Sequence, residues 1–411
     1  MTLLVLVEQH MMRLANGEVW TYDMVNASFW ERYLNVFEKI IVCGRIEKRS
    51  DNDTAGLAKS SRENVEFVAM PNFRGIKGLI ANYFRIRKII KFAISKADCI
   101  IYRAPSPISL VAYPLVRKSQ KTFAVELMNN PITQYSKESL NSILQSVIKK
   151  YVTKQTRDMC MTANGVSYVT ECTLQNMFPC QSLQKEANGY FHGSYSTIQI
   201  YQSDYQFMQF GEILPRPLVI AHSGKMNDNR KGQDLLIRVL KELTDKGYDV
   251  ELRLIGDGVI RKDFERLSED IGVSNKVSFL GWKTGYKEVQ KVLQESHLFV
   301  FPSLGEGLPR SVIEAMANGL ITIASDVDGL KELLPKDLLV YEHTTEAFTK
   351  KISDIIANWE FYNDLRNTTF KKSLCYENSL LTQKRNLFYI KLKECCSKQQ
   401  HIAIEYMKNN P

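Results

Sequence analysis

His297–Leu330, HLFVFPSLGEGLPRSVIEAMANGLITIASDVDGL, is the stretch that decides the fold of this chain. Its first five residues and the run LITIAS after Gly319 are short, apolar and rich in branched or aromatic side chains, which is typical of buried parallel strands. Pro309 suits the first turn of a helix, and Gly319 suits the left-handed position just past its end. The stretch therefore predicts a strand, a loop, a helix and a second strand.

The start of this predicted helix is a candidate ligand site. In such a unit the helix start lies at the carboxyl edge of the sheet, where open α/β sheets bind ligands. The unpaired N–H groups of residues 307–310, with the helix dipole behind them, suit a phosphate or a sugar hydroxyl oxygen. Glu306 and Glu314, with seven residues between them, flank the site. A diphosphate between polyols explains both acids, since carboxylates accept hydrogen bonds from hydroxyls while the amides hold the charge.

These residues resemble the E-x7-E signature of the retaining glycosyltransferases of family 4. The resemblance implies an α/β protein of the GT-B fold, with two Rossmann-like domains facing a central cleft. It also implies that Glu306, Gly307, Leu308 and Pro309 meet the donor sugar and that Glu314 binds the nucleotide ribose. The alternative is a helix that happens to start with an acid near its positive end.

Length and composition set the broad class. A chain of 411 residues is too long for one ordinary core, so two domains are expected. No apolar run approaches the roughly 18 residues of a membrane span, and TLLVLV near the start is too short for a signal peptide. We therefore expect a cytoplasmic protein, one that can sit on the inner face of the cytoplasmic membrane. The eight scattered cysteines indicate reduced thiols, and the net charge of +9 fits an anionic partner.

The expected organisation has three parts. Residues 1–195 form an N-terminal acceptor-binding Rossmann-like domain, and residues 215–375 form a C-terminal Rossmann-like domain for the nucleotide sugar. Residues 376–411 are helices that cross back to the first domain, as is common in GT-B proteins. The aromatic, weakly periodic run from Ala187 to about Pro215 is the predicted linker.

Basic and glycine-bearing loops of the second domain complete the expected donor site. In the family, an Arg and a Lys before a Gly neutralise the donor diphosphate. Lys231 precedes Gly232, and Lys225 replaces the arginine, so the catalytic residues implied by the resemblance are Glu306, Lys225 and Lys231. Small residues after the strand ELRLI let a nucleotide approach closely. In relatives, backbone after the glycine of the next strand recognises the base, so the resemblance implies that this glycine and the indole after it contact the base. The corresponding residues are Gly256, Gly258, Gly281 and Trp282, although Trp282 is equally compatible with core packing.

The N-terminal half departs from the family pattern. Gly17, in the polar segment after the strand Leu3–Val7, is the candidate for the glycine that approaches the donor diphosphate, and a plain turn is the alternative. Where relatives carry a His and an Asp or His near the acceptor, this sequence offers Arg103 and Glu126 or Asn129. These three are the acceptor-side candidates.

The segment RGIKGLIANYFRIRKIIKFAISK, residues 74–96, reads as a basic amphipathic helix. Ile76, Leu79, Ile80, Tyr83, Ile86, Ile89, Ile90 and Ala93 fall on one half of a helical wheel, and the basic side chains cluster on the other half. Such a helix either covers the sheet with its basic face solvated or lies on an anionic membrane surface.

The expected chemistry uses no metal and no cofactor. The triplets Asp51-Asn52-Asp53 and Asp326-Val327-Asp328 both read as non-metal, with basic residues and the helix start supplying the electrostatic stabilisation. The resemblance, including the bacterial capsule and O-antigen members, implies retaining transfer from a UDP- or GDP-linked sugar to a glycan or lipid-linked acceptor in surface polysaccharide biosynthesis. The alternative is a sugar-nucleotide or anion-binding protein without turnover. No recognised motif supports nucleic-acid binding.

Overall fold

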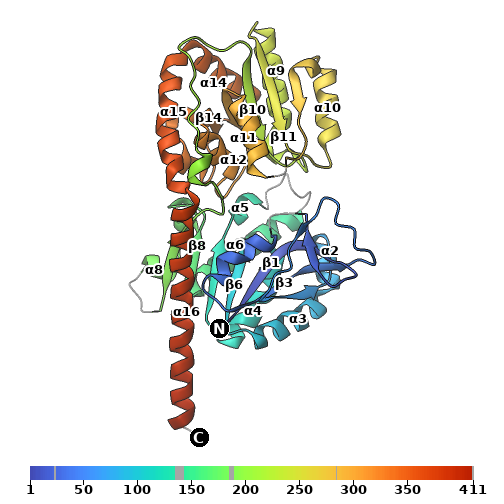
Figure 1. The fold of residues 1–411 in the computed structure, drawn as a ribbon, viewed down its shortest axis with the longest axis vertical. Helices are drawn as coiled ribbons and strands as arrows, with labels where there is room; N and C mark the ends of the chain where they lie inside the picture. Colours follow the sequence, from blue (N-terminus) through green and yellow to red (C-terminus); the bar gives the residue numbers. More distant parts are fainter. Residues whose placement is uncertain (23–24, 135–142, 185–188, 284, 410–411) are drawn as a thin grey trace. The chain divides into compact units, whose positions relative to one another are not determined.

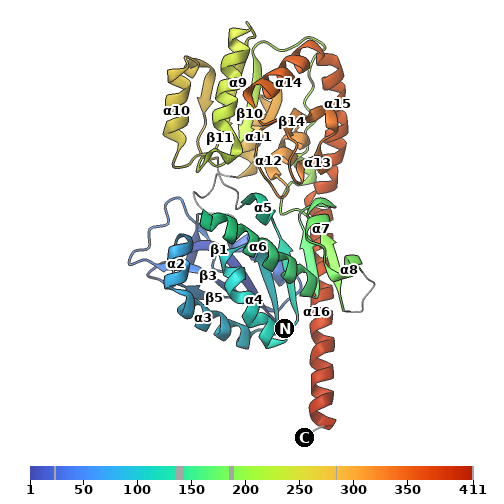
Figure 2. The same ribbon diagram turned by 180° about the vertical axis from the view of Figure 1, so that it is seen from behind.

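The structure is a computed structural model that describes residues 1–22, 25–134, 143–184, 189–283 and 285–409. The chain divides into two compact units, each with its own mostly parallel sheet and covering helices (Figures 1 and 2). Unit 1 comprises Met1–Pro131, Ile148–Tyr195 and Thr382–Pro411, and unit 2 comprises Ile132–Val147 and Ser196–Leu381. The predicted α/β class with two Rossmann-like sheets is confirmed.

Unit 2 is built on six parallel strands in the order β12-β11-β10-β13-β14-β15. Their bounds are β10 Leu218–Ser223, β11 Val250–Ile255, β12 Val277–Phe279, β13 Leu298–Phe301, β14 Ile321–Ser325 and β15 Leu339–Val340. The first and fourth strands, β10 and β13, are neighbours, so the strand order reverses between them. Open α/β sheets bind ligands at the carboxyl ends of strands beside such a reversal.

Helices cover both faces of this sheet. Because parallel crossovers are right-handed, α9 and α12 lie on opposite faces, and α9 packs with α10 and α14 while α12 packs with α15. The predicted strand, loop, helix and strand of residues 297–325 are confirmed, with α12 starting at Arg310, one residue after Pro309. The helices are α9 Gln233–Asp245, α10 Arg261–Asp270, α11 Tyr286–Gln294, α12 Arg310–Ala317, α13 Leu330–Leu333, α14 Thr345–Ala357 and α15 Trp359–Ser373.

Unit 1 holds a parallel sheet in the order β5-β3-β1-β6-β7-β8-β9. The strands are β1 Thr2–Arg13, β3 Lys39–Lys48, β5 Val65–Met70, β6 Cys99–Ala104, β7 Phe123–Leu127, β8 Gly165–Tyr168 and β9 Phe191–Ser194. The short strands β2 Val19–Thr21 and β4 Ala58–Lys59 extend the sheet beside the far end of β1.

The first strand is longer than predicted. The sequence suggested that it ends at Val7, but β1 continues to Arg13 because its second half pairs with both β3 and β2. Gly17 therefore lies in the turn of the β1–β2 hairpin, where its N–H donates to the Leu14 carbonyl at 3.0 Å and its φ is +86°.

Two sets of helices pack on the unit 1 sheet. Helices α3 and α4 are in contact, and Gln155 of α6 donates to the Leu110 carbonyl of α4 at 2.9 Å, so these three helices form one layer. Tyr33 of α1 and Tyr389 of α16 both donate to Glu126 of β7 and so lie on the same face as each other. The helices of unit 1 are η1 Ala27–Trp30, α1 Glu31–Leu34, α2 Gly75–Ala81, α3 Tyr83–Lys96, α4 Pro107–Ser119, α7 Thr173–Met177 and α8 Gln181–Gln184, together with most of α6 Ile143–Thr162 and of α16 Asn378–Asn409. Helix α5, Pro131–Gln134, belongs to unit 2 from Ile132 onward.

The predicted linker contains a strand. Within the run that begins at Ala187, β9 pairs in parallel with β8, and Phe191 and Tyr195 are buried against Phe388 of α16. Phe191 and Tyr195 of this run therefore pack in the core of unit 1, whereas Tyr201, further along, is exposed.

The predicted helix over residues 74–96 is broken into α2 and α3 at Asn82. Ile86, Ile90 and Ala93 are buried as the helical wheel predicted, but Ile80 is 69% exposed and Tyr83 is 37% exposed. A wheel drawn through the break assigns the residues around Asn82 to the wrong face. Leu79 and Ile89 are half-buried, and the side chain of Ile76 lies outside the described part.

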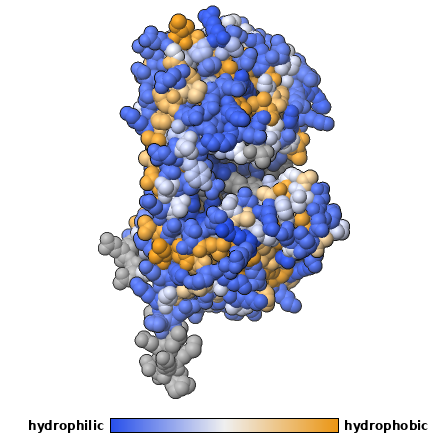
Figure 3. All heavy atoms as spheres, in the orientation of Figure 1, coloured by the Kyte–Doolittle hydropathy of each residue, from blue (hydrophilic) through white to orange (hydrophobic). Residues whose placement is uncertain are grey.

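The surface shown in Figure 3 is mostly hydrophilic, with smaller apolar areas on both units. Within the residues that the structure describes, no helix combines the length and the apolar character needed to cross a membrane.

The packing of α16 on the unit 1 sheet gives a direct stability test. Phe388 is 2% exposed and its ring centre lies 5.0 Å from that of Phe191. Replacing a buried Phe by Ala costs about 3–5 kcal/mol, so Phe388→Ala should lower the Tm of the full chain by several degrees. Leu387→Ala is the matched control, because Leu387 is 60% exposed on the same helix turn. Equal Tm values for the two variants would show that α16 does not stabilise unit 1.

Candidate functional site

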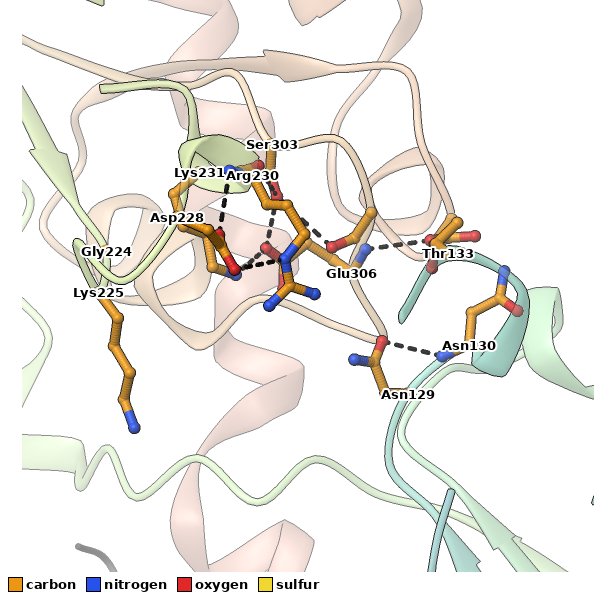
Figure 4. A network of polar contacts seen from close by, with 12 residues as sticks. Asn129, Asn130, Thr133, Gly224, Lys225, Asp228, Arg230, Lys231, Ser303 and Glu306 are labelled. Carbon is orange, nitrogen blue, oxygen red and sulfur yellow. Dashed lines mark hydrogen bonds and ion pairs between the residues drawn. The ribbon is translucent and has the colours of Figure 1, made fainter. Parts of the chain in front are cut away.

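The loops after β10 and β13 bring Lys231 and Glu306 together at the strand-order reversal of unit 2. Lys231 Nζ forms an ion pair with Glu306 Oε1, and the hydroxyl of Ser303 donates to the same oxygen at 2.7 Å (Figure 4). Ser303 is fully buried and the Glu306 side chain is 12% exposed. A cation and a buried hydroxyl thus fix the Glu306 carboxylate, for which the family resemblance implies contact with the donor sugar.

Asp328 fixes the backbone beneath this carboxylate. Its Oδ2 accepts hydrogen bonds from the Glu306 N–H at 3.0 Å and from the Thr133 hydroxyl at 3.1 Å. The other acid of the same triplet, Asp326, pairs with Lys331 at 3.2 Å. Asp51 and Asp53, from the other triplet, lie on an exposed loop. Across the described ranges, no group of three His, Cys, Asp or Glu side chains could hold a metal ion.

Backbone donors lie beside Glu306 at the start of α12. Gly307, Leu308 and Pro309 are buried, and no backbone hydrogen bond is recorded in the described part of the chain for the N–H groups of Gly307 and Leu308. Pro309 has no N–H to offer, so the donors of this turn come from its neighbours. Such donors, with a helix behind them, suit an anionic oxygen.

Glu314 lies one turn into α12 and is half-buried. No side-chain hydrogen bond to its carboxyl is recorded among the described residues. Burial raises the pKa of the Glu314 carboxyl above its usual value, and the nearby Arg310 opposes the rise. A ligand hydroxyl that donates a hydrogen bond to this carboxylate would stabilise its ionised form.

The glycines of the β11 loop lie against the neighbouring loop of the same unit. A Cβ on Gly256 would stand 2.1 Å from the Gly224 carbonyl oxygen, and one on Gly258 would stand 2.3 Å from that of Met226. The N–H of Gly256 also donates to the Gly281 carbonyl at 2.9 Å. The small size of Gly256 and Gly258 therefore lets the backbone of the loop that carries Lys225 approach closely, and their predicted contact with a nucleotide stays a prediction.

Lys225 and Trp282 form a second group, separate from the Glu306 network. Lys225 Nζ lies 5.9 Å from the centre of the Trp282 ring, and Figure 4 shows the lysine pointing away from Glu306. Trp282 is 56% exposed, so the alternative that it packs in the core is wrong. Arg230 is ion-paired with Asp228 at 2.9 Å in the same loop as Lys231.

His222, at the end of β10, is a buried support that the sequence did not reveal. Its ring stacks on Phe299 and Phe301, and its Nδ1 lies 2.9 Å from the Val300 carbonyl. Burial lowers the pKa of His222 to about 4, so the ring is neutral at pH 7. Lys231 Nζ lies 5.5 Å from the centre of the Phe301 ring in this stack. Thr133 and His222 carried no signal in the sequence, because each acts through a partner distant along the chain. Asp328 was considered only as part of a metal triplet, and Ser303, three residues before Glu306, was not singled out.

The other predicted site residues lie in unit 1. Arg103 Nε lies 3.2 Å from Glu126 Oε2. Glu126 is 3% exposed and accepts a hydrogen bond from Tyr33 at 2.9 Å, so it is a buried structural partner of Arg103. The Asn129 side-chain oxygen accepts from the Asn130 N–H at 2.8 Å, and Gly17 stays in its hairpin turn.

The raised pKa of Glu314 predicts a pH-dependent stability. A carboxyl whose pKa is raised by folding stabilises below its unfolded pKa and loses that contribution as pH rises. Glu314→Gln should therefore unfold at a higher Tm than the unaltered chain at about pH 8, and the difference should shrink toward about pH 4. The matched control is Glu269→Gln, since Glu269 is exposed on α10. A Tm difference that does not change with pH would contradict the assignment.

Comparisons with known proteins give the family of unit 2 and the fold of the whole chain. The family model described as glycosyl transferases group 1 matches residues 217–358. Protein CapJ of Staphylococcus aureus is 26% identical over 380 residues, which are 92% of this chain and 89% of CapJ.

Solved structures agree with this result. Sucrose-phosphate synthase from Thermosynechococcus elongatus has a TM-score of 0.69 at 15% identity, with 96% of this chain and 99% of that chain covered. Anabaena HepE, solved in complex with UDP and glucose, has a TM-score of 0.62 at 14% identity, with 93% and 97% covered. Residues 217–358 thus form a group 1 glycosyltransferase domain, and the chain is a glycosyltransferase with the GT-B fold.

Proposed function

We propose that this chain is a retaining, metal-independent glycosyltransferase that moves a sugar from a UDP-linked donor to a glycan or lipid-linked acceptor. The observation that carries the proposal is the Glu306 carboxylate, held by Lys231 and Ser303 beside the N–H donors of α12. The structure of HepE with UDP and glucose supports UDP over GDP as the leaving group. The similarity to CapJ supports a role in surface polysaccharide biosynthesis.

In this proposal each group of the site meets one part of the donor. Lys231, Lys225 and the amides after Glu306 neutralise the diphosphate, and Glu306 accepts hydrogen bonds from the sugar hydroxyls. Glu314 accepts from the ribose hydroxyls, and the exposed indole of Trp282 stacks on the base. The lysines and helix dipole supply the charge stabilisation that a metal ion supplies elsewhere.

The proposed transfer takes place on one face of the donor sugar. The bond between the anomeric carbon and the donor phosphate oxygen breaks, and a bond from that carbon to the acceptor oxygen forms on the same face. The acceptor proton passes to the departing phosphate oxygen. No protein nucleophile is assigned, because Glu306 is already bound by Lys231 and Ser303 and Glu314 is placed at the ribose.

Nucleotide binding tests the donor site. UDP at 100 times its Kd should stabilise the chain by about 2.7 kcal/mol, which raises its Tm by a few degrees. We expect the rise with UDP in the presence of either Mg²⁺ or EDTA, a smaller rise with GDP or ADP, and none in Lys231→Met. Lys246→Met is the control, because Lys246 is exposed in the same unit. Loss of the UDP effect in EDTA would contradict the metal-independent site.

We further propose that α2 and α3 contact an anionic membrane surface. Ile80, Phe84 and Phe92 are 69%, 82% and 52% exposed, and they alternate with basic side chains. Apolar groups among basic ones on one helix pair suit the interface of an anionic bilayer. The exposed basic residues are Arg74, Lys77, Arg85, Lys88, Lys91 and Lys96.

Vesicle sedimentation tests this contact. Burying a Phe side chain contributes about 1.5–3 kcal/mol, so Phe84→Ser should weaken binding to phosphatidylglycerol vesicles by roughly ten-fold or more. Val259→Ser, which removes an 83% exposed apolar side chain from unit 2, should leave binding unchanged. Equal sedimentation of Phe84→Ser and the unaltered chain would remove α3 as the contact.

A further inference from the structure

Two arginines of unit 1 surround one aromatic ring. The guanidinium carbons of Arg32 and Arg103 lie 4.0 and 4.7 Å from the centre of the Phe29 ring. Arg32 comes from α1, and Arg103 is the penultimate residue of β6. The two positive charges therefore share a site at the carboxyl end of the sheet, the edge at which open α/β sheets bind ligands.

The acid nearest to these arginines is already satisfied. Glu126 lies 3.2 Å from Arg103 and accepts hydrogen bonds from the hydroxyls of Tyr33 and Tyr389. It is 3% exposed and faces Arg103 across the β6–β7 register. Glu126 thus balances Arg103 and has no capacity left for a second guanidinium.

Arg32 has no such partner. It is 8% exposed, its Nε is buried without a hydrogen bond, and across the described ranges its guanidinium makes no hydrogen bond or ion pair. Burial, reinforced by the charge of Arg385, lowers the pKa of Arg32 to about 10, so the group stays charged at neutral pH. A buried, charged and unpaired guanidinium destabilises the folded state. Its stacking on Phe29 offsets only part of the free energy lost by burying the charge.

We propose that Arg32 and Arg103 form a binding site for an oxyanion carried by the acceptor, a phosphate or a carboxylate. Guanidinium groups bind both kinds of oxyanion through paired N–H donors. Such an anion would accept hydrogen bonds from the N–H groups of Arg32, for which the described residues supply no hydrogen-bond acceptor. The identification of the ligand as the acceptor rests on the proposed transferase function, whereas the oxyanion site itself does not.

Calorimetric titration of the full chain tests the site. The donor site is first saturated with UDP, and inorganic phosphate or glucuronate is then added. One equivalent of one of them should bind, and Arg32→Met should reduce that affinity about ten-fold or more, since a hydrogen bond to a charged group is strong. Arg32→Lys should give an intermediate loss, because Lys lacks the planar fork. Arg238→Met, which removes an exposed arginine of unit 2, should change nothing.

The two anions distinguish a phosphorylated acceptor from an acidic sugar. If UDP itself fails to bind, it cannot block the donor site against the added anion. The same titration is then made on Lys231→Met, so that failure of the donor site is distinguished from failure of the Arg32 and Arg103 site. The ligand-free Tm of Arg32→Met should equal or exceed that of the unaltered chain, because the variant removes an unpaired buried charge. Unchanged affinity in Arg32→Met, or no binding of either anion, would overturn the proposal.

Discussion

The pairing of β10 with β13 is the constraint on which the donor site depends. Ile220 lies opposite Leu298 and Ala221 opposite Phe299, so the two strands end side by side although 78 residues separate these partners. The loops that leave these ends carry Lys231 and Glu306. Their ion pair is therefore a consequence of strand order, and a shift of this register would separate the two charges.

Several contacts hold the loops of unit 2 in place relative to these two strands. His222 stacks on the aromatic rings of β13, and the glycines after β11 allow the backbone of the Lys225 loop to lie against them. Asp328, in the loop after β14, holds the backbone of Glu306. The loops after four strands, β10, β11, β13 and β14, thus fix the position of the Glu306 carboxylate. Electrostatic catalysis requires such a preorganised group. In unit 1, by contrast, Glu126 accepts hydrogen bonds from tyrosines, and the guanidinium of Arg32 makes no hydrogen bond or ion pair with any described residue.

The sequence was sufficient to predict features whose residues lie close together in the chain. The residues of the α12 unit and the pair Glu306 and Glu314 are close in the chain, so periodicity and spacing located them. It was insufficient where contacts join distant segments. Asp328 and Thr133 gain their roles from contacts between different segments of unit 2. The burial of Glu126 depends on tyrosines at positions 33, 195 and 389. The helical wheel over residues 74–96 was wrong near its centre because a periodic count cannot detect the break at Asn82.

Helix α16 makes unit 1 depend on the part of the chain that is synthesised last among the described residues. Its residues from Thr382 onward belong to unit 1, and Tyr389 binds Glu126 across 263 positions of sequence. Chains are made from the N-terminus and domains commonly complete in that order during synthesis. Here the ribosome must finish unit 2 before it supplies the helix that seals the core of unit 1. Unit 1, whose synthesis begins first, thus receives its last helix only after residues 196–381 of unit 2 have been made.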